Sequence, residues 1–223
     1  RRRVRGGRGQ AWENNDVRGG PTRVRPGTSG MAQARVALLM AHAARETGEP
    51  RYTRLALGAL AAFTVEVDRG GVRSMVAIAG GQQPVPWYVE RAYPGAEPWT
   101  GAALNGFMVT LLNLRGAAAL LGRAPALGPE ATTGAALATD LAARGVASLE
   151  RHLPDHDTGA WSYYGLQTPG RPWRTHVADL NYHCYHVHLL GQLAELFPDA
   201  ALADTAARWQ GYVDAAGPTC RER

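Results

Sequence analysis

Lysine is absent from this sequence of 223 residues, so all 24 side chains of the Lys/Arg type are arginines. A phosphate-binding loop of the Walker A type needs a lysine to reach the phosphates. Schiff-base catalysis needs a lysine amine. The sequence therefore excludes both of these chemistries.

Cysteine and long apolar runs are also scarce. Cys184 and Cys220 lie far apart and form no C-x-x-C pair, so the sequence indicates neither a zinc ribbon nor a disulfide scaffold, and we expect two free thiols. Arg, Glu, Asp or Pro interrupts every apolar stretch before it reaches the roughly 18–20 residues of a membrane helix. We expect a soluble chain without a membrane segment, and the lack of an apolar signal segment leaves the compartment open.

Two catalytic motifs are missing as well. The sequence has no G-x-S-x-G elbow for a serine nucleophile and no H-E-x-x-H pair for zinc. His183 and His186 could share an ion at i, i+3, but no third ligand joins them on one face of a helix. We therefore predict no metal site and expect these histidines to orient a catalytic group. The spacing leaves open a glycosidase-like carboxylate pair of Glu90 with Asp155 or Asp157.

The net charge of +5 is concentrated at the start of the chain. Residues 1–25 hold eight arginines against Glu13 and Asp16, and the remaining chain has 16 arginines against 17 acidic residues. An Arg/Gly-rich segment can bind phosphates nonspecifically, but a weakly constrained linker has the same composition. We expect residues 1–27 to form a tail or linker, and nucleic acid is not the partner that we expect.

Apolar residues recur with a helical period over six segments. Ser29 is a candidate N-cap for the first segment, which Thr47-Gly48 ends, and the second segment follows Pro50 closely enough to form a helix hairpin. Four further helices are expected over 104–122, 129–153, 179–196 and 202–213. The sequence thus predicts three helix pairs.

Extended, aromatic-rich insertions separate these pairs. An alternating run between Gly70-Gly71 and Gly80-Gly81 is typical of a β-hairpin. A turn at Asp157-Thr158-Gly159 leads into a second extended stretch, Ala160–Leu166. Helix pairs laid side by side curve into a solenoid or toroid with their insertions on one rim, which suggests a carbohydrate cleft.

Tyrosines gather on these insertions and at the start of the fifth helix. The unperturbed pKa of a tyrosine is near 10, so the residue suits proton transfer with a weak carbon acid if its site lowers that pKa. In a core the same residues would be ordinary packing groups. The five candidates are Tyr88, Tyr93, Tyr163, Tyr164 and Tyr182.

Seven short motifs, in the same order, resemble the catalytic C-terminal domain of the D-glucuronyl C5-epimerase family from about residue 28 to residue 213. Each motif is weak alone, but the ordered set is specific. The motifs are Ser29-Gly30-Met31-Ala32-Gln33-Ala34, Gly70-Gly71-Val72, Trp87-Tyr88-Val89-Glu90-Arg91-Ala92-Tyr93-Pro94, Leu104-Asn105-Gly106-Phe107, Ser148-Leu149 with Leu153-Pro154 and Asp157-Thr158-Gly159, Tyr164-Gly165-Leu166, and Asn181-Tyr182-His183 with His186.

The resemblance implies a mainly α fold, an α/α-toroid or incomplete barrel of helix hairpins with short β-hairpin insertions. This catalytic domain would span residues 28–216, between the tail or linker of residues 1–27 and a tail of residues 217–223. The implied enzyme is an isomerase that inverts C5 of D-glucuronic acid in a polysaccharide to give L-iduronic acid, without a cofactor. The expected partner is an acidic polysaccharide containing glucuronic acid, and a homodimer is possible.

The resemblance also implies roles for individual residues. The proton-transfer tyrosines of the family correspond to Tyr93, Tyr164 and Tyr182, and the acid before the first of them to Glu90. Epimerisation needs a base on one face of the sugar and an acid on the other, because the C5 proton leaves one face and returns to the opposite one. Residues expected to bind substrate are Trp87, Tyr88, Asn105, Trp161, Arg171, Arg174, His183 and His186.

Two departures from the family pattern bear on substrate binding. Gln167 stands where animal members have an arginine, so binding of the substrate carboxylate is expected to shift to Arg171 or Arg174, and Asn181 replaces an aspartate. Three alternatives remain open from the sequence: a uronate polysaccharide lyase on the same fold, a non-catalytic relative that binds acidic glycans, and nucleic-acid binding by residues 1–25.

Overall fold

The structure is a computed structural model that describes residues 2–3, 10–16, 25–77, 83–93, 101–123, 127–166, 176–198, 201–217 and 219–220. Six α-helices carry the fold in these ranges. They are α1 (Gly30–Thr47), α2 (Pro50–Ala61), α3 (Leu104–Gly122), α4 (Pro129–His152), α5 (Leu180–Leu196) and α6 (Leu202–Ala216). The prediction of a mainly α chain is confirmed, and closure of the helix pairs into a toroid stays a prediction.

Three short antiparallel strand pairs accompany the helices in the described ranges. The pair β5–β6 confirms the predicted hairpin, and Arg73 faces Tyr88 in its register. The strands are β1 (Arg2–Arg3) with β2 (Gln10–Ala11), β3 (Glu13–Asp16) with β4 (Arg25–Thr28), and β5 (Arg73–Val76) with β6 (Val85–Tyr88). Short 3₁₀ turns lie at Ala62–Thr64, Val67–Arg69 and Leu153–His156.

The helix boundaries follow from local capping chemistry. The Ser29 hydroxyl accepts a hydrogen bond from the Ala32 amide at 3.3 Å, as expected of an N-cap. Gly48 ends α1 with a φ of 69°, which favours glycine. Asp179 caps α5 by accepting a hydrogen bond from the Tyr182 amide at 2.9 Å. The caps at Ser29 and Asp179 fix the starts of α1 and α5, two of the helices that carry family motifs.

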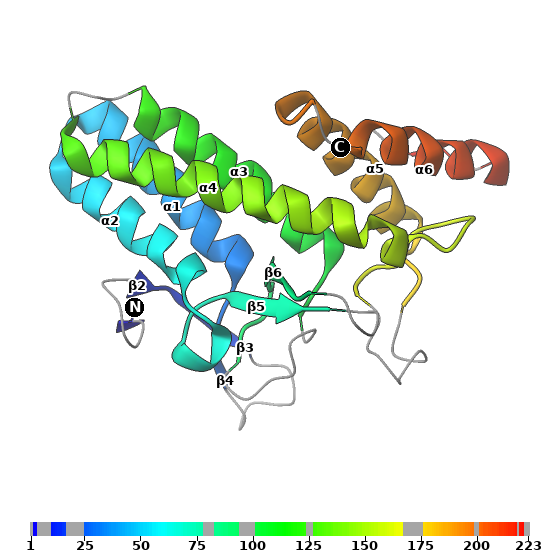
Figure 1. Ribbon diagram of the computed structural model, residues 1–223, viewed down its shortest axis with the longest axis horizontal. Coiled ribbons are helices and arrows are strands. Elements are labelled where there is room, and N and C mark those ends of the chain that lie inside the picture. Colours follow the sequence, from blue (N-terminus) through cyan, green and yellow to red (C-terminus); the bar gives the residue numbers. More distant parts are fainter. Residues whose placement is uncertain are drawn as a thin grey trace.

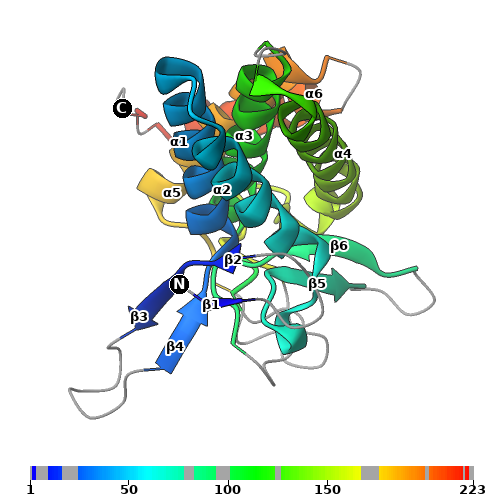
Figure 2. The same cartoon turned by 90° about the vertical axis from the view of Figure 1, so that its left-hand side faces the viewer.

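The helices form one bundle with a smaller pair at its side. α1 packs against α2 and α3, α3 also packs against α4 and α5, and α5 packs against α6. Figures 1 and 2 show the strands on one side of this bundle, with α5 and α6 beyond the C-terminal end of α4. Because α3 contacts α1, α4 and α5, it is the central helix.

The central position of α3 explains its apolar composition. By length and composition α3 could also span a membrane, but two-thirds of its apolar window (67%) is buried inside the protein. A buried core helix has this composition without any membrane. The absence of a membrane segment therefore stays a prediction.

Strands also occur in the N-terminal segment that we expected to be a tail or linker. Ala11 is buried, and the backbone carbonyl of Trp12 accepts a hydrogen bond from the Gln33 side chain of α1 at 2.8 Å. Thr28 forms a backbone bridge with Ala92. Within the segment itself, Gly27 lies against the ring of Tyr93, so its described part contacts both the bundle and the loop after β6.

The expectation of two free thiols is wrong. Cys184 in α5 and Cys220, beyond α6, form a disulfide with a Cα–Cα distance of 5.5 Å. The two cysteines are 36 residues apart, and only the antiparallel packing of α5 on α6 brings them together. The disulfide fastens the C-terminal segment to the helix that carries Tyr182.

Candidate active site

Backbone hydrogen bonds fix the stretch that carries Tyr164 between α3 and the start of α5. The Leu104 amide donates to the Tyr164 carbonyl at 2.9 Å, and the Tyr164 amide donates to the His176 carbonyl at 2.8 Å. The Leu166 amide donates to the Ala102 carbonyl at 3.1 Å. Tyr164 therefore sits where the N-terminus of α3 meets the approach to α5.

Tyr164 and Tyr182 lie in direct contact, although they come from different elements. Their ring centroids are 4.7 Å apart, and the rings meet edge to face at 76°. Tyr164 is half-buried, whereas Tyr182 is 40% exposed on the first turn of α5. The structure thus brings together two of the three tyrosines expected to transfer protons.

Glu90 belongs to the same site. Its carboxylate packs against Gly106 at the start of α3, where an added Cβ would lie 3.0 Å from Glu90 Oε2. The Glu90 amide donates to the Gly101 carbonyl at 2.8 Å. The neighbouring residue Asn105 has a buried Oδ1 atom without a hydrogen-bond partner. A glycine at position 106 is what lets Glu90 approach this helix.

The surroundings of Tyr164 keep its hydroxyl protonated. Burial is the largest cause that raises the pKa of Tyr164 to about 12, and the negative charge of Glu90 and the contact with Tyr182 add to the shift. Arg91 opposes it only in part. We expected a site that lowers the pKa of its tyrosines, and for Tyr164 the shift has the opposite direction. Tyr164 is therefore suited to donate a proton near neutral pH.

Tyr93 lies beside β4, the last of the N-terminal strands. It follows Ala92, whose amide donates to the Thr28 carbonyl at 2.7 Å. Its ring lies so close to Gly27 that an added Cβ there would come within 2.6 Å of Tyr93 Cε1. The side chain is half-buried. The backbone that carries Tyr93 thus depends on β4 for its position.

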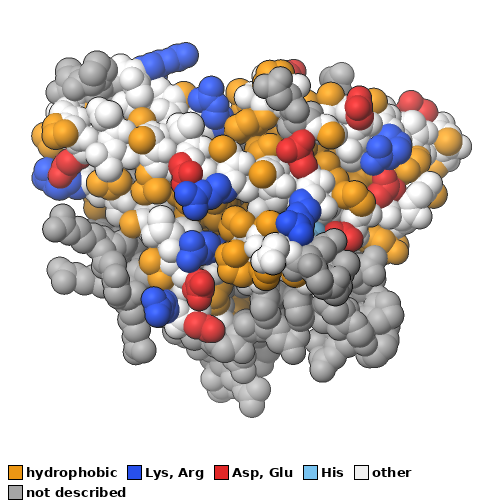
Figure 3. All heavy atoms as spheres, in the orientation of Figure 1, with side chains coloured by type: hydrophobic (Ala, Val, Ile, Leu, Met, Phe, Trp, Pro, Cys, Tyr) orange, Lys and Arg blue, Asp and Glu red, His pale blue; other side chains and the backbone are white. Residues whose placement is uncertain are grey.

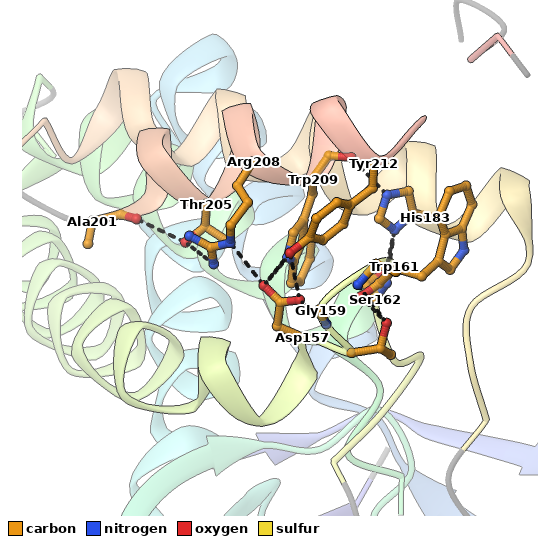
Figure 4. Close-up of polar contacts among 12 residues, drawn as sticks. Asp157, Gly159, Trp161, Ser162, His183, Ala201, Thr205, Arg208, Trp209 and Tyr212 are labelled. Carbon is orange, nitrogen blue, oxygen red and sulfur yellow. Dashed lines mark hydrogen bonds and ion pairs between the residues drawn. The ribbon is translucent and has the colours of Figure 1, made fainter. Parts of the chain in front are cut away.

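His183 and His186 form a buried network behind the tyrosines, shown in part in Figure 4. His183 Nδ1 accepts the Ser162 amide at 3.1 Å, so its Nε2 carries the proton and donates to the Trp209 carbonyl at 3.0 Å. The Ser162 hydroxyl lies 2.8 Å from that same Nδ1 and 2.9 Å from His186 Nδ1. The hydroxyl must donate to His183, because two lone pairs would otherwise face each other, and His186 must then donate to Ser162.

This network requires a neutral His183, because its Nδ1 accepts hydrogen bonds, and burial keeps His186 neutral as well. Burial lowers the pKa of His186 well below its ordinary value and also lowers the pKa of His183. Trp161 stacks on His183 with centroids 3.9 Å apart, and its Nε1 donates to the Ala178 carbonyl at 2.8 Å. Both histidines are fully buried, so they contact Ser162 rather than a solvent-exposed ligand. In the described ranges no group of three metal-ligating side chains comes together.

Asp157, predicted as a turn residue, also anchors α6, a role that the sequence did not indicate. Its carboxylate accepts hydrogen bonds from Trp209 Nε1 at 2.9 Å, Arg208 Nε at 3.0 Å and the Tyr212 hydroxyl at 3.1 Å, all from α6 (Figure 4). The Gly159 amide donates to it at 2.8 Å. These donors lower the pKa of Asp157 despite its burial. Its oxygens are thus engaged, which argues against a carboxylate pair with Glu90.

Two residues expected to bind substrate lie instead in the core. Trp87 is fully buried and stacks on Phe107 with centroids 3.8 Å apart. Tyr88 is 1% exposed, and its hydroxyl donates to the Leu141 carbonyl at 2.9 Å. Neither side chain can contact a polysaccharide in this structure, so both are corrected to packing residues. Arg171, Arg174 and Gln167 lie outside the described residues.

The chain is similar in sequence to one protein family and to a named member of that family. A family model described as the D-glucuronyl C5-epimerase C-terminus matches residues 13–211. A D-glucuronyl C5-epimerase from Caenorhabditis elegans is 30% identical over 184 residues. The aligned part is 82% of this chain but 28% of that relative, so the chain spans less than a third of the relative's length.

Proposed function

The chain belongs to the D-glucuronyl C5-epimerase family, matching its C-terminal domain, and we propose that it inverts C5 of D-glucuronic acid residues within a polysaccharide to give L-iduronic acid. The observation that carries this proposal is the contact of Tyr164 with Tyr182 beside Glu90. Two phenols from separate elements meet there, next to a carboxylate and accessible through the exposed Tyr182.

The proposed reaction moves one proton off C5 and one proton onto it. A base takes the C5 hydrogen as a proton, and the electron pair of the broken C–H bond moves into the uronate carboxylate. An acid then gives a proton to the opposite face of C5, and the carboxylate recovers its original charge. No electron is gained or lost overall, so two proton-transfer groups and donors for the carboxylate suffice.

The protonation state of Tyr164 supports a division of roles. Because its pKa is raised to about 12, we propose that Tyr164 donates the proton that inverts C5. Tyr182 is the more exposed partner, and we propose that it gives its hydroxyl proton to solvent and then, as a phenolate, receives the proton from C5. Glu90 assists by its negative charge, which favours the protonated form of Tyr164. Tyr93 remains a further proposed proton-transfer residue.

The ring contact sets a condition on this mechanism. At a centroid distance of 4.7 Å the two rings touch, so a sugar ring cannot lie between them as they stand. Tyr182 is 40% exposed and can change its χ1 rotamer more freely than the half-buried Tyr164. We propose that substrate binding turns Tyr182 away from Tyr164 and places the uronate between their hydroxyls.

The histidine network supports this geometry from behind. Ser162 bonds both His183 and His186, and it lies two residues before Tyr164. His183 lies beside Tyr182 in α5. The network therefore couples the two tyrosine-bearing backbones, and we propose that these histidines position the tyrosines and do not contact substrate. Asn105, Trp161, Arg171 and Arg174 remain the proposed substrate-binding residues.

The test is product analysis on a panel of glucuronic-acid polymers in deuterated water. The proposal predicts deuterium at C5 and the appearance of iduronic acid with no shortening of the chain. A product that absorbs in the ultraviolet and a shortened chain would instead identify a uronate lyase. Polymer binding without any C5 exchange on the panel would contradict catalysis and identify a glycan-binding relative.

A further inference from the structure

A cavity of about 610 Å³ lies between α4, the 3₁₀ turn Ala62–Thr64 that follows α2, and the β5–β6 hairpin. We call it the α4 cavity. Figure 3 shows hydrophobic side chains gathered in a hollow between these elements, with arginines around it. It contains none of the proposed proton-transfer residues. Its volume lies in the range of small-molecule sites, about 300–1,000 Å³.

The floor of the α4 cavity is apolar and offers few free polar groups. Its hydroxyl groups already donate within the protein: Tyr88 to the Leu141 carbonyl, Ser148 to the Arg144 carbonyl and Thr64 to the Ala61 carbonyl. A sugar ring would need polar partners for its hydroxyls, and this floor has almost none to give. The apolar lining consists mainly of Phe63, Met75, Val85, Pro86, Leu137 and Leu141.

The rim of the α4 cavity carries an excess of positive charge. Arg73, Arg144 and Arg151 line it together with a single acid, Asp140. Asp140 is already bonded to Arg144 Nε at 2.9 Å. Arg151 has no ion pair or hydrogen bond within the described residues. The rim thus has a surplus of cationic groups above an apolar floor.

Arg73 is a second rim arginine whose side chain is only loosely engaged within the protein. Its Nε atom is buried and has no hydrogen-bond acceptor. Its terminal NH2 group is 3.7 Å from Glu66, which is longer than a hydrogen bond. A buried guanidinium N–H without an acceptor costs stability. The buried Nε itself is out of reach of a ligand, but the Arg73 side chain is 30% exposed, so an anionic group in the cavity can meet the exposed part of the guanidinium.

We propose that the α4 cavity binds an amphipathic organic anion, with its apolar body on the floor and a carboxylate, sulfate or sulfonate group at Arg73 and Arg151. The apolar lining provides the contact for the body, and the arginines provide charge-assisted hydrogen bonds for the head group. This binding site is separate from the proposed epimerase reaction and does not depend on it.

The test is isothermal titration of the purified chain with decanoate. The proposal predicts one binding site, and Arg151→Gln should weaken binding about tenfold or more, because it removes a charge-assisted hydrogen bond. The matched control is Arg35→Gln, an exposed arginine of α1 away from the cavity, which should bind as the wild type does. Neutral 1-octanol should bind more weakly than decanoate.

A second pair of variants tests the location. Ala147 is an exposed residue of α4 that lines the cavity, so Ala147→Trp should fill it and abolish decanoate binding. Thr132→Trp, at an exposed position of the same helix outside the cavity, should leave binding unchanged. If Ala147→Trp fails to fold, as judged by its circular dichroism, the Arg151→Gln titration decides. No decanoate binding, unchanged binding in Arg151→Gln, or a glucuronic-acid oligosaccharide that displaces decanoate would overturn the proposal.

Discussion

Burial keeps Tyr164 and the buried histidines of the C-terminal region in their neutral forms. Tyr164 keeps its proton because burial and Glu90 both oppose its ionisation. Burial also keeps His156 neutral, because it disfavours the positively charged imidazolium. It lowers the pKa of His156 to about 3, and the backbone of Tyr163 opposes this shift only in part. Both ring nitrogens of His156 lack a well-formed hydrogen bond. The site therefore combines a phenol that stays protonated with imidazoles that stay neutral.

The neutral state of His156 predicts acid sensitivity. Its pKa in the folded chain, about 3, is below the ordinary value, so the unfolded chain binds the extra proton first. The stability from neutral His156 is full above about pH 6.5 and falls as the pH drops towards 3. As the pH is lowered from 6.5 to 5, the free energy of unfolding of the wild type should fall by about 2 kcal/mol more than that of His156→Phe. Urea unfolding at a series of pH values measures this difference.

The control for this prediction is His42→Gln, because His42 is exposed on α1. It should show the same pH dependence as the wild type. Parallel stability curves for His156→Phe and the wild type over this range would contradict the assignment of a neutral, buried His156.

For individual residues, the sequence predicted which tyrosines lie together better than it predicted which aromatic side chains are exposed. The motifs around Tyr164 and Tyr182 indicated two residues that do meet in space. The same reasoning placed Trp87 and Tyr88 on the substrate, yet both are buried. An aromatic residue at the end of a strand can face either the core or the solvent, and only the packing of β6 on α3 and α4 decides which.

Helices were predictable because their signals are local. Ser29, Gly48 and the prolines that begin α2 and α4 act within one turn of the chain, so their positions follow from sequence. The Cys184–Cys220 bond was not predictable, because it depends on the packing of α5 on α6. The hydrogen bonds of Asp157 to Arg208, Trp209 and Tyr212, which we call the Asp157 clamp, were not predictable for the same reason. These partners are 51 to 55 residues away in the sequence.

The disulfide predicts a measurable stabilisation of the α5–α6 pair. It closes a loop with a sequence separation of 36 residues, and the chain-entropy model gives about 3–4 kcal/mol for a loop of that size. The free energy of unfolding of the double variant Cys184→Ser with Cys220→Ser should therefore be lower by that amount, and the variant should unfold at a lower urea concentration. A reducing agent should destabilise the wild type and leave the double variant unaffected. Equal stability of the two oxidised proteins would contradict a structural role for this bond.

Asp157 predicts a second effect on the same helix pair. Asp157→Asn removes the negative charge of the carboxylate to which Arg208, Trp209 and Tyr212 donate. We expect the free energy of unfolding to fall by about 2–3 kcal/mol, since hydrogen bonds to charged groups are stronger than those between neutral groups. Chemical denaturation measures the loss. Asp204→Asn, an exposed acid of α6, is the control and should change stability by less than about 1 kcal/mol. If the two variants lost the same amount, the clamp would contribute nothing special.

At the scale of the whole molecule, the proposed active site lies where separate parts of the fold meet. The start of α3 supplies Asn105 and the glycine beneath Glu90, the stretch after α4 supplies Tyr164, and α5 supplies Tyr182. The Asp157 clamp and the disulfide both hold α6 against these parts. The position of Tyr182 relative to Tyr164 thus depends on contacts spread over the C-terminal third of the chain.

The central claim is that Tyr164 and Tyr182 transfer protons at C5, and its most direct test is the rate of C5 deuterium incorporation into a glucuronic-acid polymer. Tyr164→Phe and Tyr182→Phe should each lower that rate by about 10²-fold or more, with unchanged folding and polymer binding. Tyr52→Phe, which removes a hydroxyl bonded to Arg51 on α2, should exchange as the wild type does. Exchange within a few-fold of the wild type in both active-site variants would contradict the claim.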